Sequence, residues 1–80
     1  MLEFDLSADL PDVANVVEIK VKTDHPNGYV RVFRTPDDDE PLHIANDTLA
    51  SFGIGAIRKI YVEMITPVEA CSIVVVGWSE

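Results

Sequence analysis

Apolar and polar positions alternate with a period of two along most of this chain. Alternation of this kind places successive side chains on opposite faces of a strand, and it predicts β-strands with one buried face. It begins at residues 2–10 and recurs over residues 13–23, 29–35 and 59–64. The positions expected to face a core are Leu2, Phe4, Leu6, Ala8, Leu10, Val17, Ile19, Val21, Val30, Val32, Ile60, Val62 and Met64.

A dense group of turn-forming residues separates two of these segments. Residues 24–28 read Asp-His-Pro-Asn-Gly, and an Asn-Gly pair readily supplies the positive φ angles of a hairpin turn. The sequence therefore predicts a β-hairpin over residues 16–34.

The middle of the chain has a weaker pattern. Residues 36–41 form a charged loop bounded by two prolines, and residues 42–44 form a short predicted strand in which His43 points away from the core. Residues 45–56 leave two interpretations open. One is a single helical turn capped by Asp47, and the other is a loop that lies across the end of a sandwich.

Residues 71–78 differ from the other segments because both faces are apolar: Cys71, Ile73 and Val75 alternate with Val74, Val76 and Trp78. Such a strand is either central and covered on both sides or an edge strand buried by another chain. A chain of 80 residues is too small for a three-layer core, which favours the second arrangement. The sequence therefore predicts an interface made of Ile73, Val74, Val75, Val76 and Trp78, with Trp78 either a core anchor or a docking residue.

These segments together predict one all-β domain over residues 1–80, a small antiparallel β-sandwich or jelly-roll-like barrel of five to seven strands. Strand order stays open, because sandwich, jelly-roll and barrel share the same strand signals. The composition is 48% hydrophobic, at the upper end of the usual range of about 45–50%. The single cysteine excludes an intramolecular disulfide, so the domain must pack well or bury surface against another chain.

Charge narrows the choice of partners. The chain carries 14 acidic and 6 basic residues, a net charge of −8, with ten of the acidic residues in positions 1–40. Nucleic acids and anionic membranes are therefore not expected partners, because both are bound through Lys and Arg. The acidic N-terminus does not resemble a secretory signal, so we expect the chain to be made in a cytoplasm and to stay there or join an assembly there.

Catalytic chemistry has few candidates. The two histidines, His25 and His43, fall in a turn and on an outward strand position, and Cys71 opens an apolar strand, where a packed and inert thiol is expected. The four consecutive acids from Asp37 to Glu40 lack the alternating ligands and central glycine of a calcium loop. We therefore expect no enzyme, and no catalytic, cofactor or metal site.

One strand face suggests an alternative function. Tyr29, Arg31 and Phe33 lie together opposite the inward valines of residues 29–35. Exposed aromatic residues beside an arginine are typical of binding hot spots. This face is the candidate site of a ligand-binding module for carbohydrate or peptide, although an ordinary cross-strand ladder has the same composition.

Residues 57–62, Pro67 and residues 72–78 form a pattern that resembles the final hairpin of small β-domains in bacteriophage particles, namely capsid decoration (cement) proteins and short fibre or adaptor domains. The resemblance covers about a quarter of the chain. It implies a homo-oligomer, trimer or dimer, that binds an assembled shell such as a capsid and reinforces it without chemistry. This chain departs from the pattern in having no Gly- or Pro-rich docking arm at its N-terminus.

Overall fold

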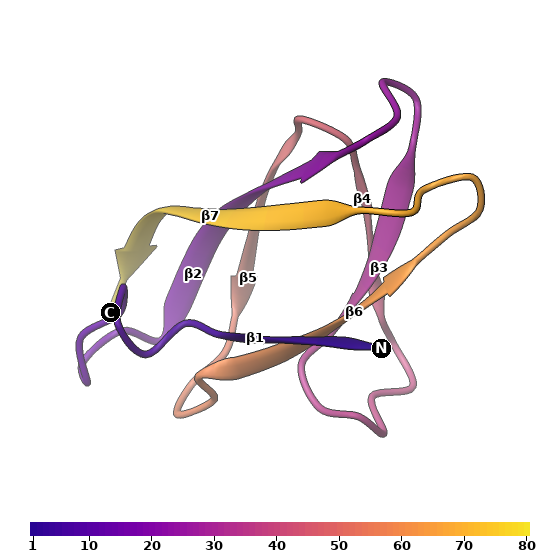
Figure 1. Cartoon of the computed structure of the whole chain (residues 1–80). Coiled ribbons are helices and arrows are strands. Elements are labelled where there is room, and N and C mark those ends of the chain that lie inside the picture. The colour runs from indigo at the N-terminus through magenta and orange to yellow at the C-terminus, as the bar shows by residue number, and fades with distance from the viewer.

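The computed structural model describes all residues from 1 to 80 and contains seven strands and no helix (Figure 1). No element of the chain is a helix long and apolar enough to cross a membrane. The strands are β1 (Leu2–Asp5), β2 (Val16–Thr23), β3 (Tyr29–Phe33), β4 (Leu42–Ala45), β5 (Leu49–Gly53), β6 (Lys59–Met64) and β7 (Cys71–Ser79).

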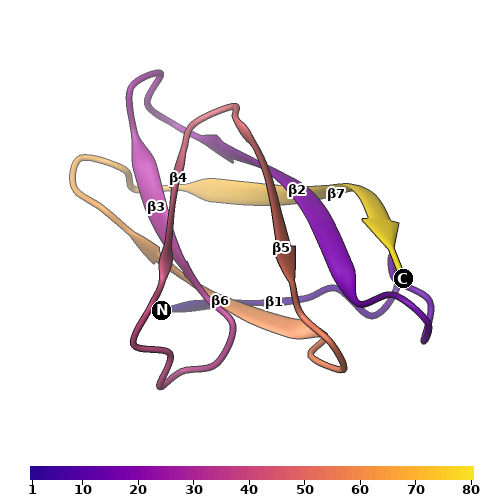
Figure 2. The same ribbon diagram turned by 180° about the vertical axis from the view of Figure 1, so that it is seen from behind.

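The strands form two antiparallel sheets that pack as a sandwich (Figures 1 and 2). One sheet has the order β1-β6-β3-β4, and the other has the order β5-β2-β7. The predicted all-β fold class is therefore confirmed, with seven strands.

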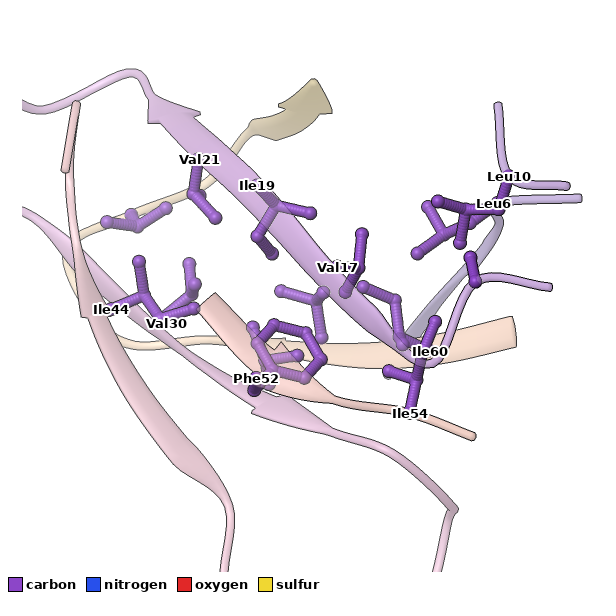
Figure 3. Packing of buried hydrophobic residues seen from close by; sticks show 14 residues of the cluster. Leu6, Leu10, Val17, Ile19, Val21, Val30, Ile44, Phe52, Ile54 and Ile60 are labelled. Atoms are coloured by element: carbon purple, nitrogen blue, oxygen red, sulfur yellow. The ribbon is translucent and has the colours of Figure 1, made fainter. Parts of the chain in front are cut away.

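The core between the sheets is entirely apolar. It consists of 14 buried residues, and no polar or charged residue is buried with them (Figure 3). Val17, Ile19 and Val21 of β2 enter it from one sheet, opposite Val30 and Ile60 from the other. Most positions predicted to face inward do so, because period-two alternation directly reports the face of a half-buried strand.

The prediction of a β-hairpin over residues 16–34 is wrong. β2 pairs with β5 and β7, whereas β3 pairs with β4 and β6 in the other sheet. The turn at residues 24–28 forms, but it carries the chain between the sheets. At the end of β2, a side chain and not a hairpin strand pairs with the backbone: the Asn46 Oδ1 accepts a hydrogen bond of 2.7 Å from the Thr23 N–H.

Crossing between the sheets is the rule in this fold. Of the six connections between consecutive strands, only the one from β3 to β4 joins neighbours in a sheet. The C-terminal segments that resemble a final hairpin therefore do not form one, because β6 and β7 belong to different sheets. The single true hairpin is closed by the acidic, proline-bounded loop.

Two further local predictions need correction. Residues 49–53 form strand β5, with Phe52 in the core, and not a helical turn or a loop. The first strand ends at Asp5, and not at residue 10, because the Asp5 Oδ1 accepts hydrogen bonds from the N–H and the hydroxyl of Ser7 and turns the chain. Leu6 and Leu10 still reach the core beyond that turn.

Candidate functional site

Strand β7 forms one edge of the three-stranded sheet and pairs only with β2 (Figure 1). Its nine residues, Cys71–Ser79, include no charged residue and no proline. Natural proteins usually protect long edge strands with charge, proline or a covering segment, because an open edge can pair with another chain. β7 is therefore a candidate interaction element.

The two faces of β7 have different environments. Ile73 and Val75 are half-buried and pack against the core, whereas Val74 and Val76 remain 52% and 47% exposed. Val74 belongs to the outer face of the sheet, where the register places it and the exposed Leu49 of β5 on either side of Lys20. This outer face therefore presents apolar side chains along both of its edges.

A β-bulge changes the direction of Trp78. The register between β2 and β7 shifts between Glu18 and Ile19, where β7 contains one extra residue. Beyond the bulge, Trp78 lies opposite Val17, whose side chain faces the core. Simple alternation predicts that Trp78 shares the outer face with Val74. Because opposed residues of an antiparallel pair share a face, Trp78 instead lies on the same face as Val17. It remains 46% exposed at the end of the strand.

The backbone of β7 has an open side. The Asp24 N–H donates a 3.1 Å hydrogen bond to the Ala70 carbonyl, just before β7 begins. Alternate residues of an antiparallel strand bond to the same neighbour, so Cys71, Ile73 and Val75 direct their N–H and C=O groups away from β2. No backbone hydrogen bond outside the strand ladders involves these three residues.

The outer face beside β7 is electrically balanced. Asp47, at a positive φ of 61° in the turn before β5, lies 3.2 Å from the Lys20 Nζ and 3.0 Å from the Lys22 Nζ. Hydrogen bonds from Lys22 and then Lys20 lower the pKa of the Asp47 carboxyl. With Glu18 on the same face, two positive and two negative charges surround the apolar positions, in contrast to the acidic molecule as a whole.

The four-stranded sheet carries the predicted alternative site on its outer face. Tyr29, Arg31 and Phe33 do lie together there, as alternation predicts. The neighbouring strands add His43 and Tyr61, which lie opposite Arg31 and Phe33. The face is therefore more aromatic than β3 alone indicates. Sequence reasoning missed the two additions because they depend on which strands are neighbours.

Contacts within this aromatic face are specific. The Tyr29 and His43 rings stack with their centroids 5.9 Å apart and their planes at 19°. The Arg31 Nη1 lies 3.2 Å from the Glu63 Oε1 across the β3–β6 pair, while the Arg31 Nε is buried without a hydrogen-bond partner. An unpaired buried donor is costly.

The titratable residues considered for catalysis are separated. His43 lies on the outer face of the four-stranded sheet, whereas His25 lies in the turn before β3, with its Nε2 3.9 Å from the Asp24 Oδ2. Cys71 is half-buried against the core. Burial, followed by the nearby Asp24 carboxylate, raises the pKa of the Cys71 thiol. A raised pKa keeps the thiol in its unreactive protonated form near neutral pH.

The acidic loop organises itself around one carboxylate. Asp38 accepts hydrogen bonds from the Glu40 N–H, at 3.0 Å, and from the Arg34 N–H and Nε, at 3.1 and 3.3 Å. These bonds, led by the one from Glu40, lower the pKa of the Asp38 carboxyl. No group of three or more His, Cys, Asp or Glu residues in the structure is arranged to hold a metal ion. The loop closes the β3–β4 hairpin.

Arg58 is a structural residue that sequence reasoning missed. Its guanidinium donates five hydrogen bonds of 2.7–3.3 Å to backbone carbonyls, on Gly55, Ile57, Pro11, Asp12 and Ala14. The side chain therefore ties the connection before β2 to the connection before β6. In the sequence Arg58 reads only as a charged residue beside a strand, because the five acceptors are backbone atoms.

No protein-family model, no curated protein and no solved structure matches this chain.

Proposed function

We propose that this protein is a non-enzymatic assembly subunit that forms a homo-oligomer and attaches to a larger protein shell, such as a virus capsid, which it stabilises. One observation carries the proposal. The core closes without Val74, Val76 and Trp78, and these large apolar side chains stay exposed along the uncharged edge strand β7, with Leu49 exposed at the far edge of the same sheet. Exposed apolar surface of this kind marks protein interaction sites.

The distribution of charge supports the same function. Most acidic residues fall in positions 1–40, whereas β7 carries none and the outer face beside it is balanced. A subunit of this kind adheres through one region and stays soluble through the remainder. Residues 57–62, Pro67 and residues 72–78 resemble capsid decoration proteins, and this resemblance supports a virus particle as the specific shell. It rests on the pattern of the strands alone, because β6 and β7 do not pair with each other.

Co-sedimentation with intact particles from the protein's source tests this function. We expect the wild-type chain to pellet with the particles and to raise the temperature at which they rupture. Replacing Val76 and Trp78 with serine should abolish both effects. The control, Tyr29→Ser on the opposite sheet, should retain them. Failure of the wild-type chain to co-sediment, or equal binding by all variants, would remove the shell-binding proposal.

A ligand-binding module is the second candidate function, favoured by the stacked Tyr29–His43 pair and by Arg31 on the same outer face. The aromatic rings would pack against a sugar or a peptide side chain, and Arg31 would donate to an acceptor on it. A glycan array and a peptide library test this function. Binding that Tyr29→Ala removes and Leu49→Ala leaves intact would support it, and an absence of hits would exclude it for these ligand classes.

A further inference from the structure

We infer that β7 pairs in antiparallel fashion with β7 of a second copy of this chain, about a two-fold axis at Ile73. The inference rests on the homo-oligomer of the proposed function and names the contact that builds it. It joins two three-stranded sheets into one continuous sheet with the order β5-β2-β7-β7-β2-β5.

The free backbone groups have the symmetry that this pairing needs. Cys71, Ile73 and Val75 point their N–H and C=O groups away from β2. Cys71 and Val75 each lie two residues from Ile73 along the strand. When two such edges meet about Ile73, the two copies of Ile73 exchange both hydrogen bonds. Cys71 of each copy does the same with Val75 of the other. All six free groups on each copy are then satisfied.

The length of the pairing matches the ladders within the molecule. Residues 71–75 give five paired positions, and the register shift that follows breaks the regular pattern. β2 pairs with β5 over five positions, and β1 pairs with β6 over four. The bulge thus limits the contact to the regular part of β7 and leaves Val76 and Trp78 outside it, available to a shell.

Side chains across the contact are compatible. Ser72 of one copy lies opposite Val74 of the other on the outer face, so a small side chain accompanies each exposed valine. On the inner face Cys71 lies opposite Val75, and both already pack against their own core. The pairing therefore covers apolar surface without placing any charged group opposite another.

The charges around this edge are compatible with a second copy. Within a chain of net charge −8, the outer face beside β7 balances Lys20 and Lys22 against Glu18 and Asp47. The edge strand of the other sheet, β1, has only four residues and carries Glu3 and Asp5. β4 and β5 are the edge strands on the other side of the sandwich. One short turn connects them, so their edges lie close to each other at that turn (Figure 2). β7 is thus the longest of the four free edges, and it carries no acidic residue.

Disulfide trapping tests the register. All proteins carry Cys71→Ser, and one also carries Ser72→Cys while the other carries Val74→Cys. Positions 72 and 74 form a non-hydrogen-bonded pair across the proposed contact, with Cα atoms about 4.5 Å apart, within disulfide range. An equal mixture, oxidised gently and separated by intact mass, should give the mixed disulfide well above its statistical half. A mixture of Ser72→Cys with Leu49→Cys, on the far edge of the same face, should give no excess.

A statistical mixture in the first experiment would overturn the pairing. A preference for disulfides between two copies of Val74→Cys or two copies of Ser72→Cys would also overturn it, because the axis would then lie elsewhere than Ile73.

Absolute mass by light scattering over a hundredfold concentration range tests the oligomer independently. The wild-type chain should reach a dimer, and Val74→Glu should raise the dissociation constant at least tenfold. Leu49→Glu is the matched control, because Leu49 and Val74 are both exposed and flank the same Lys20. A monomer throughout, a trimer, or equal effects of the two variants would overturn the inference. Co-sedimentation of the wild-type chain with particles, observed alongside any of these results, would leave the shell-binding function standing.

Discussion

Replacing Arg58 with methionine is expected to destabilise the protein by about 2–3 kcal/mol. Three of the five carbonyls that Arg58 binds lie in exposed surroundings, where water replaces the lost donor at little cost. The other two, on Ile57 and Ala14, are partly buried. A hydrogen bond contributes a net of about 0.5–1.5 kcal/mol, and one from a charged donor contributes more, so the two partly buried bonds together give the expected loss of about 2–3 kcal/mol. Methionine keeps the length and much of the apolar stem.

Urea denaturation followed by circular dichroism measures this loss. In thermal denaturation of a domain of this size, the expected fall in Tm is about 8–24 °C, at roughly 4–8 °C for each kcal/mol. Arg58→Lys should keep most of the defect, because a single ammonium group cannot serve acceptors on two connections as the planar guanidinium does. Lys59→Met, at the exposed neighbouring position, is the control and should change stability by less than about 0.5 kcal/mol.

An Arg58→Met protein as stable as the wild type would refute this reasoning. The two connections would then be held by their backbone contacts alone, in which the Asn15 carbonyl accepts hydrogen bonds from the N–H groups of Ile54 and Gly55.

Two further changes test the packing and the electrostatics of the loops. Gly28→Ala should cost about 1–3 kcal/mol in urea denaturation, because a Cβ at this position would overlap the buried Val68 Cγ2. Gly53→Ala, whose Cβ would have its nearest neighbour at 3.9 Å, should be close to neutral, and equal effects of the two would contradict the expected overlap. Asp38 has a lowered pKa in the folded protein, so its stabilising effect is complete above the unfolded value of about 3.9 and is lost as the pH falls through the lower folded value. Asp38→Asn should therefore flatten the decline of unfolding free energy below about pH 4, whereas Asp37→Asn should not, and identical pH profiles for all three proteins would count against this role.

The face of each strand was readable from the sequence, whereas its neighbours were not. Alternation identified Val17, Ile19, Val30 and Val62 as inward-facing, because burial on one side is a property of a single strand. A hairpin and a connection that crosses between sheets produce the same alternation, with the same Asn-Gly turn between the strands. The pairing of β2 with β5 and β7 depends on contacts far away in the chain.

The candidate site shows the same division. Composition identified β7 as unusual, and its edge position agrees with one of the two predicted alternatives. The direction of Trp78 was missed, because a bulge adds one residue without any signal in an apolar run. The addition of His43 and Tyr61 to the aromatic face was missed as well, since it requires the order of strands in the sheet.

The chain's repeated passage between the two sheets governs how it can fold. Five of its six connections change sheet, so a growing segment finds its hydrogen-bonding partner only after distant residues arrive. Proteins dominated by such non-local pairing fold in milliseconds to seconds, slower than helical domains of equal size. Because each sheet is completed only by strands from distant parts of the chain, we expect folding to be a single cooperative step. Until that step is complete, the uncharged strand at the C-terminal end of the chain is open to association with other unfolded copies. Dilute refolding should accordingly give higher yields than concentrated refolding.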